Sequence, residues 1–138
     1  MPMDAISQSL AGLPSFLLYF VLGLALITAF VAVYVRVTPY NEIALIREGN
    51  AAAAVSLSGA LLGFVLPLAS AIAHSIGPVD MIVWASIAFV VQIAVYFAVA
   101  RVVPRFAEAI RAGRVSAATL LAAMSVAVGV LNAASMTY

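Results

Sequence analysis

The chain has 138 residues, of which 67% are hydrophobic and only 8% are charged, with a net charge of +1. An ordinary soluble domain has about 25% charged residues, so this composition excludes a water-soluble domain and favours a membrane protein. Cysteine is absent, which excludes disulfides and a thiolate-bound metal.

The N-terminal stretch, residues 1–14, contains Asp4 but no Lys or Arg. It therefore lacks the basic region that begins a secretory signal peptide. We expect the apolar segment that follows to be retained as a helix.

Four apolar segments contain no Asp, Glu, Lys, Arg or His, and they cover residues 15–35, 51–73, 81–100 and 115–136. Each is close to the roughly 20 residues that a helix needs to cross a bilayer. The runs are unbroken, whereas a membrane strand alternates apolar and polar residues over about ten positions. The sequence predicts an all-α integral membrane protein of four transmembrane helices in a single membrane domain, residues 1–138.

All six basic residues are arginines, and they fall in two of the connections. Arg36 and Arg47 lie between the first and second apolar segments, and the third connection holds Arg101, Arg105, Arg111 and Arg114. Connections rich in Lys and Arg stay on the cytoplasmic side. We expect both arginine-bearing connections in the cytoplasm, and both termini in the periplasm of a cell with an inner membrane.

The two halves of the sequence resemble each other at an offset of 64 residues. The stretch 46–72 lies over 110–136, matching Ile46, Arg47 and Gly49 with Ile110, Arg111 and Gly113. The sequence predicts two tandem hairpins, about 14–73 and about 78–136, inserted in the same direction. Such parallel repeats are related by an axis along the membrane normal.

Each arginine-bearing connection has the pattern of a short interfacial helix, about 39–48 in one copy and about 104–112 in the other. Pro39 and Pro104 suit a first helical position, and Gly49 and Gly113 suit a C-terminal cap. Thr38 is the expected N-cap of the first. Their apolar residues should face the lipid or the bundle, and their charged residues should face water.

Small residues recur on two of the expected spans. Gly59 and Gly63 are four residues apart, and Ala123 and Ala127 occupy the matching positions. Small residues let helices approach closely in lipid, either within one subunit or between subunits. Because the supply exceeds what one bundle can use, we expect a homo-oligomer that a Gly63→Leu substitution disrupts. Pro67 should kink its helix.

The polar residues inside the expected spans include Thr28, Gln92 and Asn132. None of them titrates near neutrality, which argues against ion coupling by side-chain protonation. They either form hydrogen bonds between helices or line a polar pathway. His74 and Asp80 flank the turn between the hairpins but are too few for a metal site.

The run 38–71 and the ending 131–138 resemble the YjfL-like family of bacterial inner-membrane proteins, domain of unknown function 350. The resemblance rests chiefly on Thr38-Pro39, Asn41-Glu42, Gly49-Asn50 and Pro67-Leu68. It implies a four-helix inner-membrane protein without an assigned reaction. It also implies a setting in envelope stress, beside a phage-shock-like peripheral protein and a peptide-ligase-like enzyme.

No nucleophile with a base, no phosphate loop and no basic patch beyond what orientation requires is present, so we expect no enzymatic activity, no cofactor and no nucleic-acid partner. The expected partners are the lipid bilayer, further copies of the chain and a cytoplasmic or peripheral membrane protein. A membrane-embedded scaffold or envelope-stress component is the favoured function, and a small homo-oligomeric channel or transport facilitator is the alternative. The scaffold would dock its partner through Thr38, Asn41, Glu42, Arg47, Asn50, Arg105, Glu108 and Arg111.

Overall fold

The computed structural model describes residues 2–136, and this part of the chain consists of helices and short connections without a strand. The helices are α1 (Pro2–Leu10), α2 (Leu13–Val37), α3 (Glu42–Arg47), α4 (Ala51–His74), α5 (Pro78–Val102), α6 (Phe106–Arg111) and α7 (Val115–Ser135). Four spans are long and apolar enough to cross a membrane: α4, α5, α7 and the combined stretch Met3–Val37. The predicted all-α class and the four spans are confirmed.

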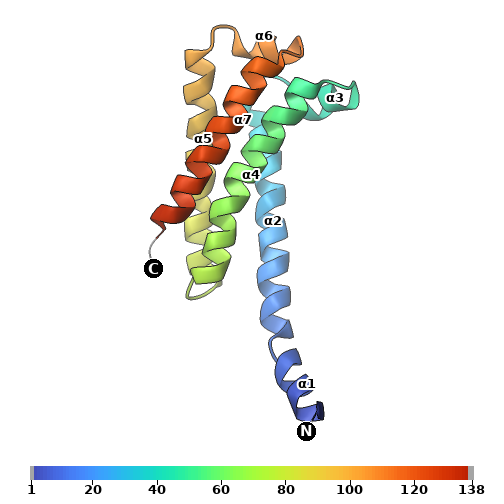
Figure 1. Cartoon of the computed structure of the whole chain (residues 1–138), viewed down its shortest axis with the longest axis vertical. Helices are drawn as coiled ribbons and strands as arrows, with labels where there is room; N and C mark the ends of the chain where they lie inside the picture. The colour runs from blue at the N-terminus through green and yellow to red at the C-terminus, as the bar shows by residue number, and fades with distance from the viewer. Residues whose placement is uncertain (1, 137–138) are drawn as a thin grey trace.

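The helix α1 was not predicted from the sequence. It begins at Pro2 and ends at Leu10, and the side chains of residues 3–10 are exposed. It lies beyond the start of α2, away from the bundle (Figure 1), and none of the side chains of residues 3–10 is buried.

The short helices α3 and α6 lie together at one end of the bundle, which we call the arginine-rich end (Figure 1). Both begin later than predicted, because Pro39 and Pro104 end the preceding helices. The residue before a proline is forced into an extended conformation. Thr38, with ψ of 142°, is therefore the C-cap of α2, and Val103, with ψ of 113°, is the C-cap of α5.

The N-cap of α3 is consequently another residue than the predicted Thr38. Asn41 caps α3, and its Oδ1 accepts a hydrogen bond from the Ala44 amide at 3.2 Å. Arg105 precedes α6 in a left-handed conformation, with φ of 53°.

The C-terminal glycines behave as predicted. Gly49 and Gly113 have φ of 88° and 79°, a region that only glycine adopts without cost. Each is followed by an amide that reaches back into the short helix, Asn50 to Leu45 and Arg114 to Ala109, both at 2.9 Å. This is the Schellman arrangement, and it turns the chain sharply into the next span.

The element boundaries repeat along the chain. The helices α3 and α6 begin 64 residues apart, as do α4 and α7, whereas α2 and α5 begin 65 residues apart. One extra residue in the connection 38–41 accounts for the difference. Whether the two hairpins superimpose about an axis along the membrane normal stays a prediction.

The tightest packing joins α4 to α7. A Cβ atom added to Gly59 would lie 2.3 Å from the Ala122 Cα, and one added to Gly63 would lie 2.3 Å from the Ser125 carbonyl oxygen. These glycines are used inside one subunit, so Gly63→Leu would break the bundle itself and cannot report on association. Ala123 and Ala127 are exposed, and Ala122 and Gly129 make the close contacts instead.

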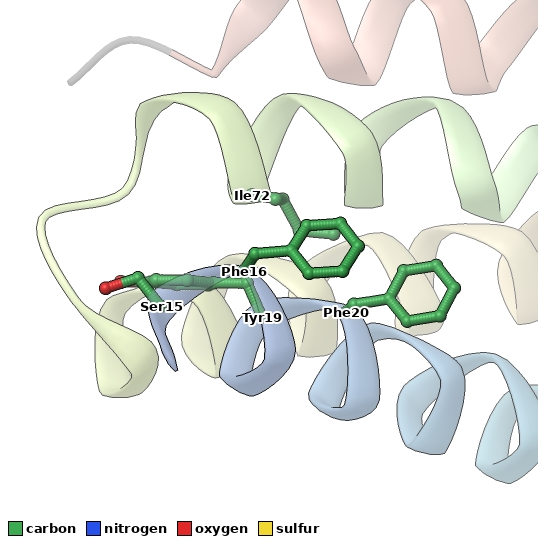
Figure 2. A pocket seen from close by; sticks show the side chains of 5 residues that line it. All are labelled: Ser15, Phe16, Tyr19, Phe20 and Ile72. Carbon is green, nitrogen blue, oxygen red and sulfur yellow. The ribbon is translucent and has the colours of Figure 1, made fainter. Parts of the chain in front are cut away.

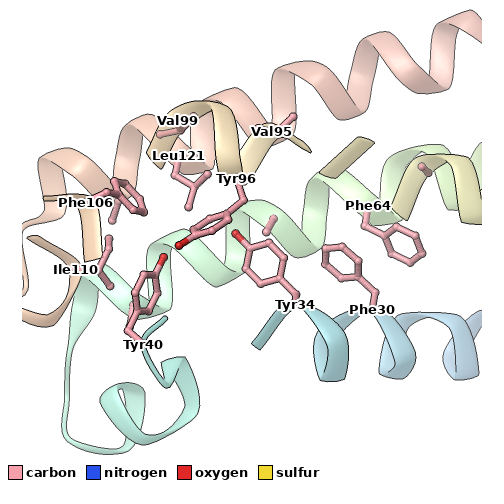
Figure 3. Packing of buried hydrophobic residues seen from close by; sticks show 14 of the residues in the cluster. Phe30, Tyr34, Tyr40, Phe64, Val95, Tyr96, Val99, Phe106, Ile110 and Leu121 are labelled. Carbon is pink, nitrogen blue, oxygen red and sulfur yellow. The ribbon is translucent and has the colours of Figure 1, made fainter. Parts of the chain in front are cut away.

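The core runs from the middle of the bundle to the arginine-rich end. Phe30 stacks on Phe64 with ring centroids 4.5 Å apart, and Phe89 meets both edge-on. Three tyrosines follow toward α3 and α6 (Figure 3). Pro67 is buried within α4, which continues to His74.

Candidate functional site

The arginine-rich end is built from two connections that are distant in sequence and locked together. Asn50 Nδ2 donates to the carbonyl oxygens of Ile110 at 2.9 Å and Arg111 at 3.3 Å. The same side chain caps α4, because its Oδ1 accepts from the Ala53 amide at 3.0 Å. One asparagine therefore ties the end of α6 to the start of α4.

A second hydrogen bond joins the end of α6 to the segment before α3. The Arg111 guanidinium donates to the Pro39 carbonyl oxygen at 2.5 Å. Since Pro39 precedes α3 and Arg111 ends α6, the two short helices form one unit rather than two independent loops.

The outer surface of this unit is charged, and most of the predicted docking residues lie on it. Arg105 and Glu108 form an ion pair with 4.0 Å between Nε and Oε2, but their side chains are 84% and 69% exposed. A pair so exposed contributes about 0–1 kcal/mol. Exposed side chains elsewhere at this end are Arg36, Asn41, Arg47, Glu48, Arg101, Arg111 and Arg114.

Glu42 contradicts the prediction that charged residues of the short helices face water. Glu42 is completely buried, and Thr38 is 5% exposed. The Thr38 hydroxyl lies 2.5 Å from Glu42 Oε1. The physical reason is that α3 begins at Glu42, after the Asn41 N-cap, rather than at Pro39, so that Glu42 lies in the first turn with its carboxyl group buried in the bundle. Burial raises the pKa of Glu42 to about 7, although the hydrogen bond from Thr38 opposes the increase.

Three tyrosines lie close enough to Glu42 for its charge to act on them. The hydroxyl groups of these residues, Tyr34, Tyr40 and Tyr96, point toward one another, as Figure 3 shows. All three tyrosines are nearly fully buried, and Phe106 and Ile110 close the cluster from α6. Burial also raises the pKa of the Tyr40 hydroxyl above its usual range. We call Glu42, Thr38 and these three tyrosines the buried polar cluster.

Sequence reasoning missed this cluster. Tyr96 lies 54 residues beyond Glu42 in the chain, and nothing in the local pattern places them together. The available signal was the arrangement of three tyrosines near the ends of expected helices, beside an acidic residue.

The predicted intramembrane polar residues do not share one path. Thr28 is exposed and its hydroxyl donates to the Leu24 carbonyl oxygen within α2. Gln92 is buried and donates from Nε2 to the Ser125 carbonyl oxygen at 3.0 Å, so it bridges α5 and α7. Asn132 is half-buried on α7.

At the opposite end, an apolar hollow of about 310 Å³ lies between α2 and the end of α4. It is lined by Ser15, Phe16, Tyr19, Phe20 and Ile72 (Figure 2). Among the described residues, no group of three His, Asp or Glu side chains could hold a metal ion.

A bundle of four apolar spans capped by charged connections defines a multi-pass membrane protein. The family model Domain of Unknown Function (DUF350) matches residues 8–136, and the chain belongs to this family. The chain is also similar to the UPF0719 inner membrane protein YjfL of Escherichia coli strain K12, at 36% identity over 129 residues. That match covers 94% of this chain and 98% of the relative.

The protein of the same name from Escherichia coli O157:H7 matches with equal identity and coverage. No solved structure matches the chain. The family and the inner-membrane location are therefore shown, and the family carries no assigned activity.

Proposed function

We propose that the protein is a non-enzymatic scaffold of the inner membrane, acting as an envelope-stress component, whose arginine-rich end binds a cytoplasmic or peripheral membrane protein. The observation that carries the proposal is the pair of links from Asn50 to α6 and from Arg111 to Pro39. They hold two connections in one fixed geometry, and a preorganised surface loses less entropy on binding.

The orientation is part of the proposal. All six arginines belong to the arginine-rich end, and none lies near either terminus. The distribution of Arg and Lys between connections sets the orientation of membrane helices. The arginine-rich end then faces the cytoplasm, and both termini face the periplasm.

The chemistry of the surface suggests the partner. The arginine-rich end carries six arginines and two exposed glutamates, Glu48 and Glu108, because Glu42 is buried. A protein surface that is acidic on balance and offers some basic groups complements this arrangement. Rim charges of this kind set association rate and salt dependence more than affinity.

Site-specific photo-crosslinking in membranes tests the proposal. Crosslinkers at Arg47 and at Glu108 should capture the same protein, since both residues belong to one surface. Crosslinkers at Ile76 and Val79, which are exposed at the opposite end, provide the control. Capture of unrelated proteins at Arg47 and Glu108, or equal capture at the control positions, would contradict docking. Solute flux through the protein in liposomes would favour the alternative, a homo-oligomeric channel.

A further inference from the structure

Glu42 is the acidic residue that the described fold buries completely, and it has no ion-pair partner there. Its Oε1 contacts the Thr38 hydroxyl, while its Oε2 makes no hydrogen bond within the described part of the chain. An ionised carboxylate in such a place is strongly disfavoured unless it is paired. The proposed binding of a partner at the arginine-rich end does not require a buried, unpaired carboxyl group.

The number of protons at Thr38 gives an independent argument. The Thr38 hydroxyl lies within hydrogen-bond distance of three acceptors: the Val35 carbonyl at 3.2 Å, the Tyr40 carbonyl at 3.1 Å and Glu42 Oε1 at 2.5 Å. A hydroxyl has one proton to donate. If Glu42 is neutral, it can donate to Thr38, and the Thr38 proton is then free for one of the two carbonyl groups. If Glu42 is ionised, it accepts the Thr38 proton, and neither carbonyl group receives it.

The groups that face Glu42 supply no compensating charge at close range. The charge of Glu42 acts on three tyrosine hydroxyls, which belong to Tyr34 of α2, Tyr40 and Tyr96 of α5, and none of these hydroxyls carries a positive charge. The charge of Arg111 in α6 acts on the Tyr96 hydroxyl. The Arg111 guanidinium donates a hydrogen bond to the Pro39 carbonyl oxygen. The charged residues of α2 and α5 nearest this end, Arg36 and Arg101, are exposed, as is Glu108 of α6. The helix α7 has no charged residue, and α4 has only His74, at its far end.

We propose that Glu42 is a proton-binding site that keeps α3 seated on the bundle while neutral and loosens α3 when it ionises. The ionised carboxylate seeks water, and the nearest route to water is outward movement of the first turn of α3. Because burial raises its pKa to about 7, the site changes state near neutral pH. The Tyr34 hydroxyl makes no hydrogen bond within the described part of the chain and carries no charge that could balance an ionised carboxylate.

The proposal is independent of whether a partner binds the arginine-rich end. Should docking also hold, α3 would present its charged face in one geometry at acidic pH and in another at alkaline pH. If the docking proposal fails its test, the proposed protonation of Glu42 still stands. If the protonation proposal fails, docking at the arginine-rich end still stands.

Infrared titration of the full chain in nanodiscs tests the proposal directly. The C=O stretching band of a protonated carboxylic acid should disappear with a midpoint near pH 7 in the natural chain. Glu42→Gln should remove this transition, and Glu108→Gln, at an exposed position of α6, should leave it unchanged. Hydrogen exchange of α3, corrected for intrinsic pH dependence, should accelerate at least tenfold across the same range only when Glu42 is present.

Absence of a carboxylic acid band between pH 5.5 and 8.5 in the natural chain would overturn the proposal without any variant. A band that persists in Glu42→Gln would also overturn it, since another acid would then be responsible. An α3 that exchanges at the same corrected rate on both sides of the transition would refute the loosening.

Discussion

At the residue scale, the three glycines Gly59, Gly63 and Gly129 set the distance between α4 and α7. A Cβ on Gly129 would lie 2.3 Å from the Gly63 carbonyl oxygen, so backbone meets backbone here. In lipid the hydrophobic effect does not drive helices together, and close contact of this kind is a main source of association.

We predict that Gly59→Ala destabilises the bundle by about 1–3 kcal/mol, because the added methyl group overlaps the Ala122 backbone and forces the helices apart. Gly12→Ala is the matched control, since its Cβ would meet the Ser9 carbonyl oxygen at an ordinary 3.7 Å. Unfolding in mixed micelles measures both variants. Equal stability of Gly59→Ala and the natural chain would contradict the described packing.

Glu42 makes stability depend on pH. Its pKa is raised from 4.5 to about 7 in the folded chain, so the folded state holds a proton that the unfolded state releases between these values. Its stabilising contribution is complete below pH 4.5 and is lost as pH rises toward 7. The expected loss is about 1.4 kcal/mol per pH unit within this range.

Unfolding free energies at pH 5 and pH 7 measure this effect. The natural chain should be less stable at pH 7, and Glu42→Gln should remove that difference. Glu48→Gln, which alters an exposed acid of the same connection, should retain it. A Glu42→Gln chain with the full natural pH dependence would disprove the assignment.

The buried polar cluster shows where sequence reasoning stops at this scale. The spacing of Ile43 and Ile46 predicted a short amphipathic helix with its apolar residues toward the lipid or the bundle and its charged residues toward water. Ile43 is 39% exposed, which the lipid alternative allows, whereas Glu42 is buried, which the prediction does not allow. The segment before α3 is held by Arg111, which lies 72 residues further along the chain and donates to the Pro39 carbonyl oxygen, and no local pattern contains this contact.

At the element scale, the predicted spans agree with the helices because long apolar runs without charges leave few alternatives. The predicted starts of α3 and α6 were too early, by three residues and two residues. Proline was interpreted as a helix start, although its stronger effect here is to end the preceding helix. The glycines that follow α3 and α6 were predictable, because a residue in the left-handed conformation is required at such a helix end.

The link between the two connections depends on Asn50, and two substitutions separate its roles. Asn50→Ser keeps an N-cap for α4 but is too short to reach α6, whereas Asn50→Ala loses both functions. We predict faster hydrogen exchange of α6 in both variants. Only Asn50→Ala should also fray the start of α4, at a cost of about 1 kcal/mol. Unchanged exchange of α6 in both would contradict the link.

At the scale of the whole molecule, the second and fourth spans form a close pair, while much of α2 stands apart. Large side chains such as Phe16, Leu17, Phe20 and Val21 are half exposed or more. A surface of this kind suits lipid. The choice between lipid and protein at each face was not available from the sequence, because both environments accept the same residues.

That the protein is a homo-oligomer stays a prediction. Because Gly63 packs inside the bundle, the substitution that tests association has to lie at an exposed position. A shallow groove between α4 and α7 is lined by Ala54, Val55, Ser58, Gly59, Leu62, Thr119, Ala122, Ala123 and Val126. Self-association through this groove, in a dimer with closed symmetry, would use small residues that one bundle leaves exposed.

We predict that Ala123→Leu weakens self-association without unfolding the chain, because its side chain is exposed within the groove. Val90→Leu, on the exposed face of α5, is the control. The mass in nanodiscs measures the outcome. A monomeric natural chain, or an oligomer unaffected by Ala123→Leu, would contradict association through this groove.

The central claim is that the arginine-rich end, with its linked short helices and buried polar cluster, faces the cytoplasm. A reporter active only in the periplasm, fused after Tyr138, tests it most directly, because four spans place both termini on the side opposite that end. We predict an active periplasmic reporter there and an inactive one inserted between α6 and α7. A cytoplasmic reading after Tyr138 would contradict the claim and remove the docking surface from its proposed partner.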